Sequence, residues 1–185
     1  NIRDCTSLRG TVYWSSALPQ NTSDFTVLPS FETVSENKNE YIKMFKEFSA
    51  NNDPYDSKGL IQKHDNRYVV QNRPQLPLSQ HELDRVYGLD YTRKVHPFCL
   101  SQGYVKGIDT VRFSITSHRG CYGGCSFCAI TLHQGRIIQS RSISSILREA
   151  EQISKDEKFN GYISDIGGPT ANMYGHDCLK KVELG

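Results

Sequence analysis

The first part of the chain alternates between short apolar runs and polar breaks that contain proline. Two runs rich in β-branched and aromatic residues, 9–14 (RGTVYW) and 25–31 (FTVLPSF), predict two strands or extended segments. From Glu36 onward apolar residues recur three and four positions apart, which predicts an amphipathic helix ending between Asn51 and Pro54. We assign its apolar face to core packing: Tyr41, Met44, Phe45 and Phe48.

The middle of the chain is less regular. We predict a short helix over residues 57–64 and then a strand that runs into an extended, proline-spaced connector over residues 67–79. Ser79, with Glu82 three residues later, forms the sequence signature of a capping box at the start of the next helix. Residues 91–107 contain glycines, a proline and few periodic apolar positions, so we expect a linker there.

The last part of the chain has the pattern of a β-α-β unit. Residues 111–116 (VRFSIT) alternate apolar and polar side chains, which predicts a strand, and residues 161–168 (GYISDIGG) predict a second, parallel strand. Between them lies a helix capped by Ser142 or Ser144. Its predicted apolar face consists of Ile143, Ile146, Leu147, Ala150 and Ile153. Both strands end at the sheet edge where α/β proteins bind ligands.

Length and charge narrow the class of protein. The 185 residues allow one domain or parts of two, and because the chain lacks an initiator methionine we expect it to be a piece of a longer protein. A net charge of +2 with mixed signs predicts no dedicated nucleic-acid surface. No run of about eighteen apolar residues and no secretory signal occurs, so we expect no membrane span.

The candidate chemistry lies between the two predicted strands of the β-α-β unit. Cys121, Cys125 and Cys128 are spaced C-x3-C-x2-C in a glycine-rich loop, RGCYGGCSFCAIT. Three thiolates hold three irons of a cubane and leave the fourth open to a small molecule, whereas four would close it. Half of the six cysteines crowd into this loop, which favours a reducing, cytoplasmic setting over a disulfide scaffold.

Two alternatives accompany this interpretation. The thiolates also suit a structural zinc ion, with His118, His133 or Cys99 as the fourth ligand. Phe127, next to Cys128, offers an aromatic face for the adenine of a nucleotide-like ligand. The alternative is that Phe127 packs in the hydrophobic core. The separate cysteines Cys5 and Cys99 are expected to be buried packing residues.

The cysteine loop resembles the cluster loop of the radical S-adenosyl-L-methionine (AdoMet) superfamily. The longer string RGCYGGCSFCAITLHQGRIIQSRS, with SDIGGPTANMY downstream and LPSFETV upstream, is similar over essentially the whole chain to the YgiQ family of radical SAM proteins. The resemblance implies a [4Fe-4S] cluster on Cys121, Cys125 and Cys128, with AdoMet at the open iron. It also implies an α/β fold: the start of a partial (β/α)6 TIM-like radical SAM barrel, preceded by the C-terminal part of an N-terminal α/β domain, with the boundary between residues 105 and 106.

The resemblance assigns further roles near the cluster. Gly167 and Gly168 occupy the place of the glycine-rich motif that contacts the AdoMet amino group, although the acid that usually follows is replaced by Pro169, so Asp165 is the candidate substitute. Two arginines, Arg136 and Arg141, are candidates for the AdoMet carboxylate or for the solvated surface. Cys178 is a candidate for an auxiliary metal site.

The sequence therefore predicts an iron-sulfur enzyme that cleaves AdoMet reductively to a 5'-deoxyadenosyl radical. Its expected partners are an electron donor and a substrate that these residues do not identify. The rival from another class is a non-enzymatic module that binds zinc or an iron-sulfur cluster for structure or sensing.

Overall fold

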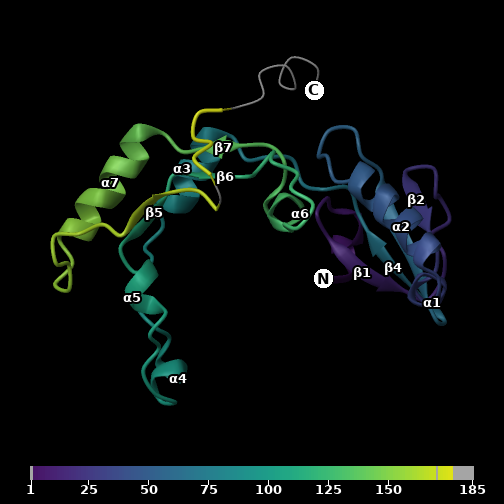
Figure 1. Cartoon of the computed structure of the whole chain (residues 1–185), viewed down its shortest axis with the longest axis horizontal. Helices are drawn as coiled ribbons and strands as arrows, with labels where there is room; N and C mark the ends of the chain where they lie inside the picture. The colour runs from purple at the N-terminus through teal and green to yellow at the C-terminus, as the bar shows by residue number, and fades with distance from the viewer. Residues whose placement is uncertain (1, 170, 177–185) are drawn as a thin grey trace. The chain divides into compact units, whose positions relative to one another are not determined.

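The computed structural model describes residues 2–169 and 171–176 and divides into two compact units, Asn1–Pro77 and Leu78–Gly185 (Figure 1). The predicted domain boundary near residue 105 stays a prediction. Both units mix helices and strands, so the fold is α/β, as predicted. No helix among the described residues is long and apolar enough to cross a membrane.

The first unit is built on a mixed four-stranded sheet with the order β1-β4-β3-β2. The neighbours β1–β4 and β3–β4 are antiparallel, and β2–β3 is parallel. The bounds are β1 Val12–Ser15, β2 Phe25–Leu28, β3 Gly59–His64 and β4 Arg67–Gln71, and a 3-10 helix, Ile2–Ser7, precedes them. The strands β1 and β2 confirm the predictions made from the β-branched and aromatic runs, and β4 confirms the strand predicted to begin at residue 67.

Two helices connect β2 to its parallel neighbour β3, α1 (Phe31–Glu36) and α2 (Lys38–Ala50). Asn37 separates them: its backbone N–H donates to Thr33 O at the end of α1, and its side chain accepts from Asn39 N at the start of α2. The helix predicted from Glu36 is confirmed as α2. Three of its predicted apolar residues help to line a groove of about 340 Å³ against the sheet, with the lining Leu28, Met44, Phe45, Phe48, Leu60, Gln62, Val69 and Gln71. The core packing predicted for this face is wrong for Tyr41 and Phe45, which are 49% and 46% exposed.

The helix predicted over residues 57–64 is wrong, because this segment contains strand β3. Leu60 and Ile61 are adjacent and both buried, which fits a strand covered on both faces. Hydrogen-bonded neighbours lie on both sides, β2 at one edge and β4 at the other. Asp65, in the left-handed region with φ 50°, makes the tight turn from β3 to β4.

The second unit contains two small ladders. The strands β5 (Ser114–Thr116) and β8 (Asp165–Gly167) pair in parallel, whereas β6 (His118–Arg119) and β7 (Gln139–Ser140) pair antiparallel. Its helices are α3 Gln80–Tyr87, α4 Pro97–Leu100, α5 Ile108–Val111, α6 Ile130–Gln134 and α7 Ile143–Ser154. The predicted parallel pair is confirmed, but both strands are shorter than predicted, since Val111 ends α5 and residues 161–164 carry no strand.

Both predicted helix caps are confirmed. The Ser79 hydroxyl accepts from Glu82 N (3.3 Å) while the Glu82 carboxylate accepts from Ser79 N (2.9 Å), which completes the capping box of α3. At the start of α7 the Ser142 hydroxyl accepts from Ser145 N (3.1 Å). The carboxylate of Asp84 in α3 accepts from Ser142 N (2.9 Å), so it fixes the start of α7 against α3.

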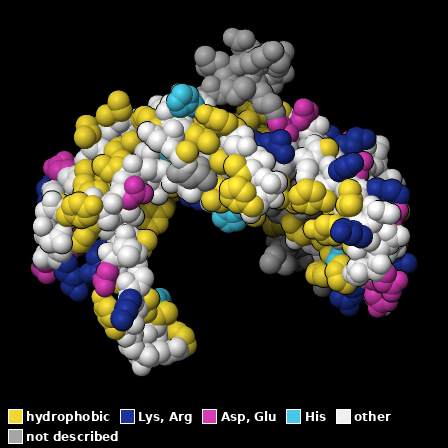
Figure 2. Space-filling model, in the orientation of Figure 1, with side chains coloured by type: hydrophobic (Ala, Val, Ile, Leu, Met, Phe, Trp, Pro, Cys, Tyr) yellow, Lys and Arg dark blue, Asp and Glu magenta, His cyan; other side chains and the backbone are white. Residues whose placement is uncertain are grey.

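The predicted apolar face of α7 is only partly correct. Ile153 is buried, but Ile143 and Leu147 are 68% and 62% exposed. Figure 2 shows hydrophobic side chains over the region of α7. The buried stripe is Ser145, Glu149 and Ile153 instead, because an ion-pair network described below draws Glu149 inward.

Candidate metal centre at the cysteine loop

The β6–β7 ladder closes the base of the cysteine loop. His118 pairs with Ser140 and Arg119 with Gln139, so residues 120–138 form one excursion between paired strands. Gly120 follows β6 with φ 92°, and a β carbon there would overlap the carbonyl group of Ile137. Only glycine therefore allows the loop to leave the ladder at this point.

The three cysteines differ in exposure. Cys121 is 6% exposed, and it packs against Ile138, Met173 and Ile130 in the small core of this unit. Its backbone N–H donates to Gly135 O (2.9 Å), which ties the start of the loop to the end of α6. Cys125 is exposed and Cys128 is half-buried. One ligand is thus set into the core while the other two lie nearer to solvent.

Gly123 brings two of the sulfurs to one place. A β carbon on Gly123 would lie 3.4 Å from Cys121 Sγ and 3.6 Å from Cys125 Sγ. The Gly123 N–H also donates to Cys121 Sγ (3.4 Å). Two cysteine sulfurs therefore lie close to Gly123, which has no side chain to keep them apart. Sulfur ligands of this kind suit iron or zinc.

The third sulfur is not gathered with the first two. Over residues 2–169 and 171–176, no group of three or more His, Cys, Asp or Glu side chains is arranged to hold a metal ion. Closure of a loop around a metal commonly accompanies binding, because the site is completed by the ion itself. The predicted three-cysteine ligand set stays a prediction.

Phe127 lies on the surface of the loop and is 91% exposed. The alternative of a core phenylalanine is therefore wrong for this side chain. An exposed ring beside Cys128 presents an apolar face to any ligand that approaches the loop. Its contact with an adenine stays a prediction.

A cavity of about 240 Å³ runs along β5 and β8 and reaches their carboxyl ends. It extends from the predicted glycine pair, Gly167 and Gly168, to His118 and Arg119 at the base of the cysteine loop, and Asp165 also lines it. Arg119 is held by Gln134 Oε1 (3.1 Å) and Tyr87 Oη (3.0 Å). The volume matches part of a nucleotide-sized ligand rather than all of it.

Gly168 is packed directly against His118. A β carbon at Gly168 would lie 2.7 Å from His118 Cδ2 and closer still to Cε1 and Nε2. Packing against the imidazole therefore requires a glycine here, whatever ligand lies beyond it. Gly167 has no such neighbour, and its carbonyl accepts from Ser117 N (2.7 Å).

His118 is fully buried, and both of its ring nitrogens have partners. Nδ1 lies 3.0 Å from Ser117 Oγ, and Nε2 accepts from Met173 N (3.3 Å). Burial lowers the pKa of His118 below its ordinary value, and a backbone hydrogen bond with Ala171 offsets part of this lowering. The sequence indicated His118 only as a candidate fourth zinc ligand, and its two partners leave no ring nitrogen for that role. Of the other candidates, His133 pairs with Gln134 (2.9 Å) and Cys99 lies exposed in α4.

Arg141 has a structural role rather than the predicted one at a ligand carboxylate. Its guanidinium is fully buried and forms an ion pair with Glu149. Further hydrogen bonds reach Thr116 O (2.8 Å) and the hydroxyl and carbonyl of Ser145, so all five N–H donors are used. The guanidinium also stacks on the Tyr87 ring at 4.4 Å. Arg136, the other predicted candidate, is exposed in the loop.

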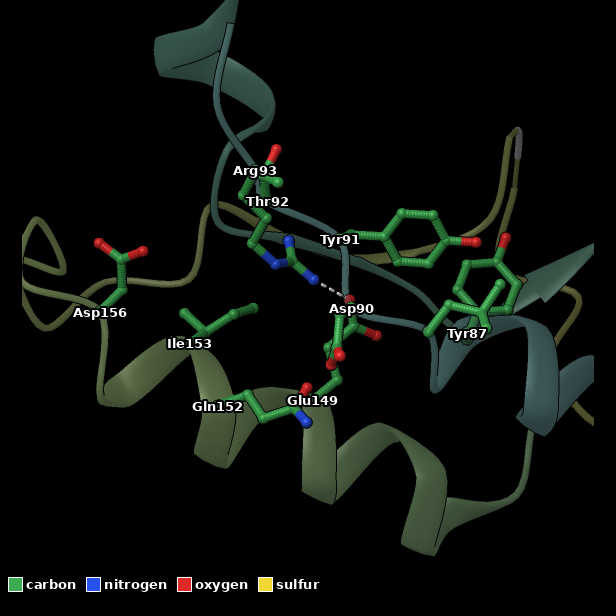
Figure 3. A pocket seen from close by; sticks show the side chains of 10 residues that line it. Tyr87, Asp90, Tyr91, Thr92, Arg93, Glu149, Gln152, Ile153 and Asp156 are labelled. Atoms are coloured by element: carbon green, nitrogen blue, oxygen red, sulfur yellow. Dashed lines mark hydrogen bonds and ion pairs between the residues drawn. The ribbon is translucent and has the colours of Figure 1, made fainter. Parts of the chain in front are cut away.

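Glu149 forms a second ion pair with Arg93, which comes from the linker (Figure 3). Arg93 also donates to Arg112 O (2.9 Å) and Ser114 O (3.3 Å), at the start of β5. Arg93 and Glu149 line a cavity of about 410 Å³, and its other lining residues are Tyr87, Leu89, Asp90, Tyr91, Thr92, Gln152, Ile153 and Asp156. The two arginines thus hold both ends of β5, the strand that leads into the cysteine loop.

Cys5 is half-buried and Cys99 is exposed, so the prediction that both are buried is wrong. The predicted auxiliary cysteine, Cys178, lies outside the described residues.

The radical SAM N-terminal family matches residues 1–114, and that match ends at the start of β5. A UPF0313 protein from Thermotoga petrophila is 51% identical over 178 residues, which cover 96% of this chain and 31% of the relative. One from Fusobacterium nucleatum is 46% identical over 185 residues, which cover 100% of this chain and 32% of the relative.

A UPF0313 protein from Clostridium botulinum is 50% identical over 179 residues, which cover 97% of this chain and 28% of the relative. The chain spans about a third of the length of these relatives. No solved structure matches it. The family match covers more than half of the sequence, and the UPF0313 relatives extend the similarity across the cysteine loop, so the chain belongs to the radical SAM N-terminal family.

Proposed function

We propose that this chain carries the cluster-binding start of a radical SAM enzyme. In this proposal Cys121, Cys125 and Cys128 bind a [4Fe-4S] cluster, and AdoMet extends from it toward the cavity at the carboxyl ends of β5 and β8. The observation that carries the proposal is the approach of two cysteine sulfurs to Gly123, in a loop whose base borders that cavity. Membership of the radical SAM N-terminal family supports it.

When bound and reduced by one electron, such a cluster supplies the reductive cleavage of AdoMet to methionine and a 5'-deoxyadenosyl radical that acts on an unknown substrate. The chain contributes position and exclusion of water. Met173 and Ile138 bury Cys121 on one side, and the exposed ring of Phe127 offers a face for the adenine. Asp165, on the cavity wall, is the proposed partner of the AdoMet amino group.

We further propose that β5, α7 and β8 form the first unit of a partial (β/α)6 barrel. A parallel strand pair joined through a helix is the repeating unit of such barrels, and ligands bind at the carboxyl edge of their strands. The proposed partners are an unknown substrate and an electron donor, because cleavage consumes one electron. A reducing, cytoplasmic setting would keep the three thiols available.

Metal and sulfide analysis of the full-length protein tests the proposal. The protein is reconstituted anaerobically with iron and sulfide, and we expect a brown protein with about four irons and four sulfides per chain. Cys99→Ala is a matched control, since this cysteine is exposed but lies outside the loop. A colourless protein that retains zinc would contradict the proposal and support the structural metal module instead.

A further inference from the structure

We propose that His118 is a positioning residue, which holds the segment after β8 against the cysteine loop and so sets the two walls of the cavity between them. This inference deepens the proposed function and rests on it for the identity of the ligand. The arrangement of His118 and its neighbours is a property of the chain alone. It is therefore testable without a cluster.

The backbone of His118 belongs to the cysteine-loop wall. His118 pairs with Ser140 in the β6–β7 ladder, and Cys121 follows three residues later. The preceding residue, Ser117, donates its N–H to Gly167 O (2.7 Å) and accepts from Arg141 N (3.0 Å). The segment that begins the cysteine loop is therefore fixed between β8 and β7.

The side chain of His118 contacts the opposite wall, which is the segment after β8. Its ring fills the space beside Gly168, and its Nε2 accepts from Met173 N (3.3 Å). Met173 in turn packs against Cys121. One imidazole thus contacts the glycine at the ligand edge and the residue that covers the buried cysteine.

Two further hydrogen bonds fasten the same segment to β7 and its end. The Tyr174 hydroxyl donates to Arg141 O (2.7 Å), and Gly175 N donates to Ser140 Oγ (2.9 Å). The ring of Tyr174 also meets that of His118 edge-on, with centroids 6.5 Å apart. These bonds anchor the far end of the segment. At the near end the Ser117 N–H holds Gly167 O, and the ring of His118 packs against Gly168 itself.

As a positioning residue, His118 takes no direct part in proton transfer or metal binding. A fully buried ring whose nitrogens are both engaged has no free position for a proton or a metal. Its effect on a ligand is therefore indirect. If the ring is lost, Gly168 loses the side chain that packs against it, and groups placed by that wall lose part of their alignment.

A double-mutant cycle on the metal-free full-length protein tests the geometry. Gly168→Ala should lower the unfolding midpoint in the native background, because the new methyl group overlaps the imidazole. In the His118→Ala background the space is open, so the same change should cost far less. Equal losses in both backgrounds would overturn the inference.

AdoMet binding to the reconstituted protein tests the positioning role. His118→Gln introduces a side-chain amide whose oxygen can accept from Met173 N, but the new side chain does not fill the space beside Gly168. We expect unchanged iron content and an AdoMet affinity lowered about tenfold, which corresponds to about 1.4 kcal/mol. His81→Gln, at an exposed histidine in α3, is the matched control and should bind as the native protein does.

The outcomes separate this inference from the proposed function. Native AdoMet affinity in His118→Gln, measured well below its unfolding midpoint, would overturn the positioning role while the enzyme proposal stands. A native protein that holds no cluster would overturn the enzyme proposal and the ligand part of this inference. The double-mutant cycle would still decide whether His118 positions the Gly168 wall.

Discussion

Glu149 and Arg141 form an ion pair in which the guanidinium is almost completely buried and the carboxylate nearly so. The pair joins α7 to the end of β7, and Arg93 shares the same carboxylate. Glu149→Gln would leave two guanidinium groups facing a neutral amide. We expect a loss of about 3–5 kcal/mol in the free energy of unfolding, the usual cost of removing one partner of a buried pair. Denaturant unfolding of the full-length protein measures it.

The control for this change is Glu151→Gln, two residues along the same helix. Glu151 pairs with Lys155, and both side chains are about two-thirds exposed. A pair of this kind contributes little, because solvent screens it. A loss as large for Glu151→Gln as for Glu149→Gln would argue against a structural role for the buried network.

The second prediction concerns pH and His118. Its folded-state pKa is lowered by burial, so below the unfolded pKa of about 6.5 the unfolded chain binds a proton that the folded chain does not. Stability contributed by neutral His118 is therefore fully present above that pKa and is lost as the pH falls below it. We expect the metal-free protein to lose stability between about pH 7 and pH 5.5, and to lose less of it in His118→Gln. Parallel pH profiles for the two proteins would show that His118 is not the group responsible.

The third prediction uses the unequal exposure of the cysteines. In the metal-free protein an alkylating reagent should modify Cys125 before Cys121, because Cys121 is packed in the core and Cys125 is not. A bound cluster should protect both, whereas Cys99 in α4 should react in either state. Peptide mass spectrometry after timed alkylation measures each site. Faster modification of Cys121 than of Cys125 would be inconsistent with the packing described here.

The fourth prediction concerns the ligand set. Replacing Cys121, Cys125 or Cys128 singly by alanine should abolish cluster retention, because two thiolates do not hold a cubane against loss of iron. Cys5→Ala and Cys99→Ala should keep the iron content of the native protein. Iron analysis after desalting gives the result. Cluster loss in Cys99→Ala as complete as in Cys125→Ala would require a four-ligand site and a different account of the open iron.

Local signals in the sequence predicted the elements that local interactions determine. Ser79 with Glu82 predicted a capping box, and the pair Ser142 or Ser144 predicted the start of α7, because a cap is formed by residues within one helical turn. The segment 57–64 was misread, because its strand form is set by pairing with β2 and β4, which are distant in sequence.

The site shows the same division between local and distant determinants. The spacing of Cys121, Cys125 and Cys128 is visible in the sequence, and so is the glycine pair before Pro169. The buried ion pair of Arg141 was not visible, because nothing in the sequence distinguishes a structural arginine from one at a ligand. The packing role of His118 was not visible for a similar reason, since its partner Gly168 is fifty residues away in the chain.

The proposed function depends most on three cysteines that hold a cluster with one iron open to AdoMet. The most direct measurement is a titration of AdoMet into the reduced, reconstituted full-length protein, followed by the electron paramagnetic resonance signal of the cluster. We predict that the signal changes shape and saturates as AdoMet binds, because the amino and carboxylate groups become ligands of the open iron. A signal unchanged at saturating AdoMet would contradict the claim and leave an electron-transfer or sensor protein as the better account.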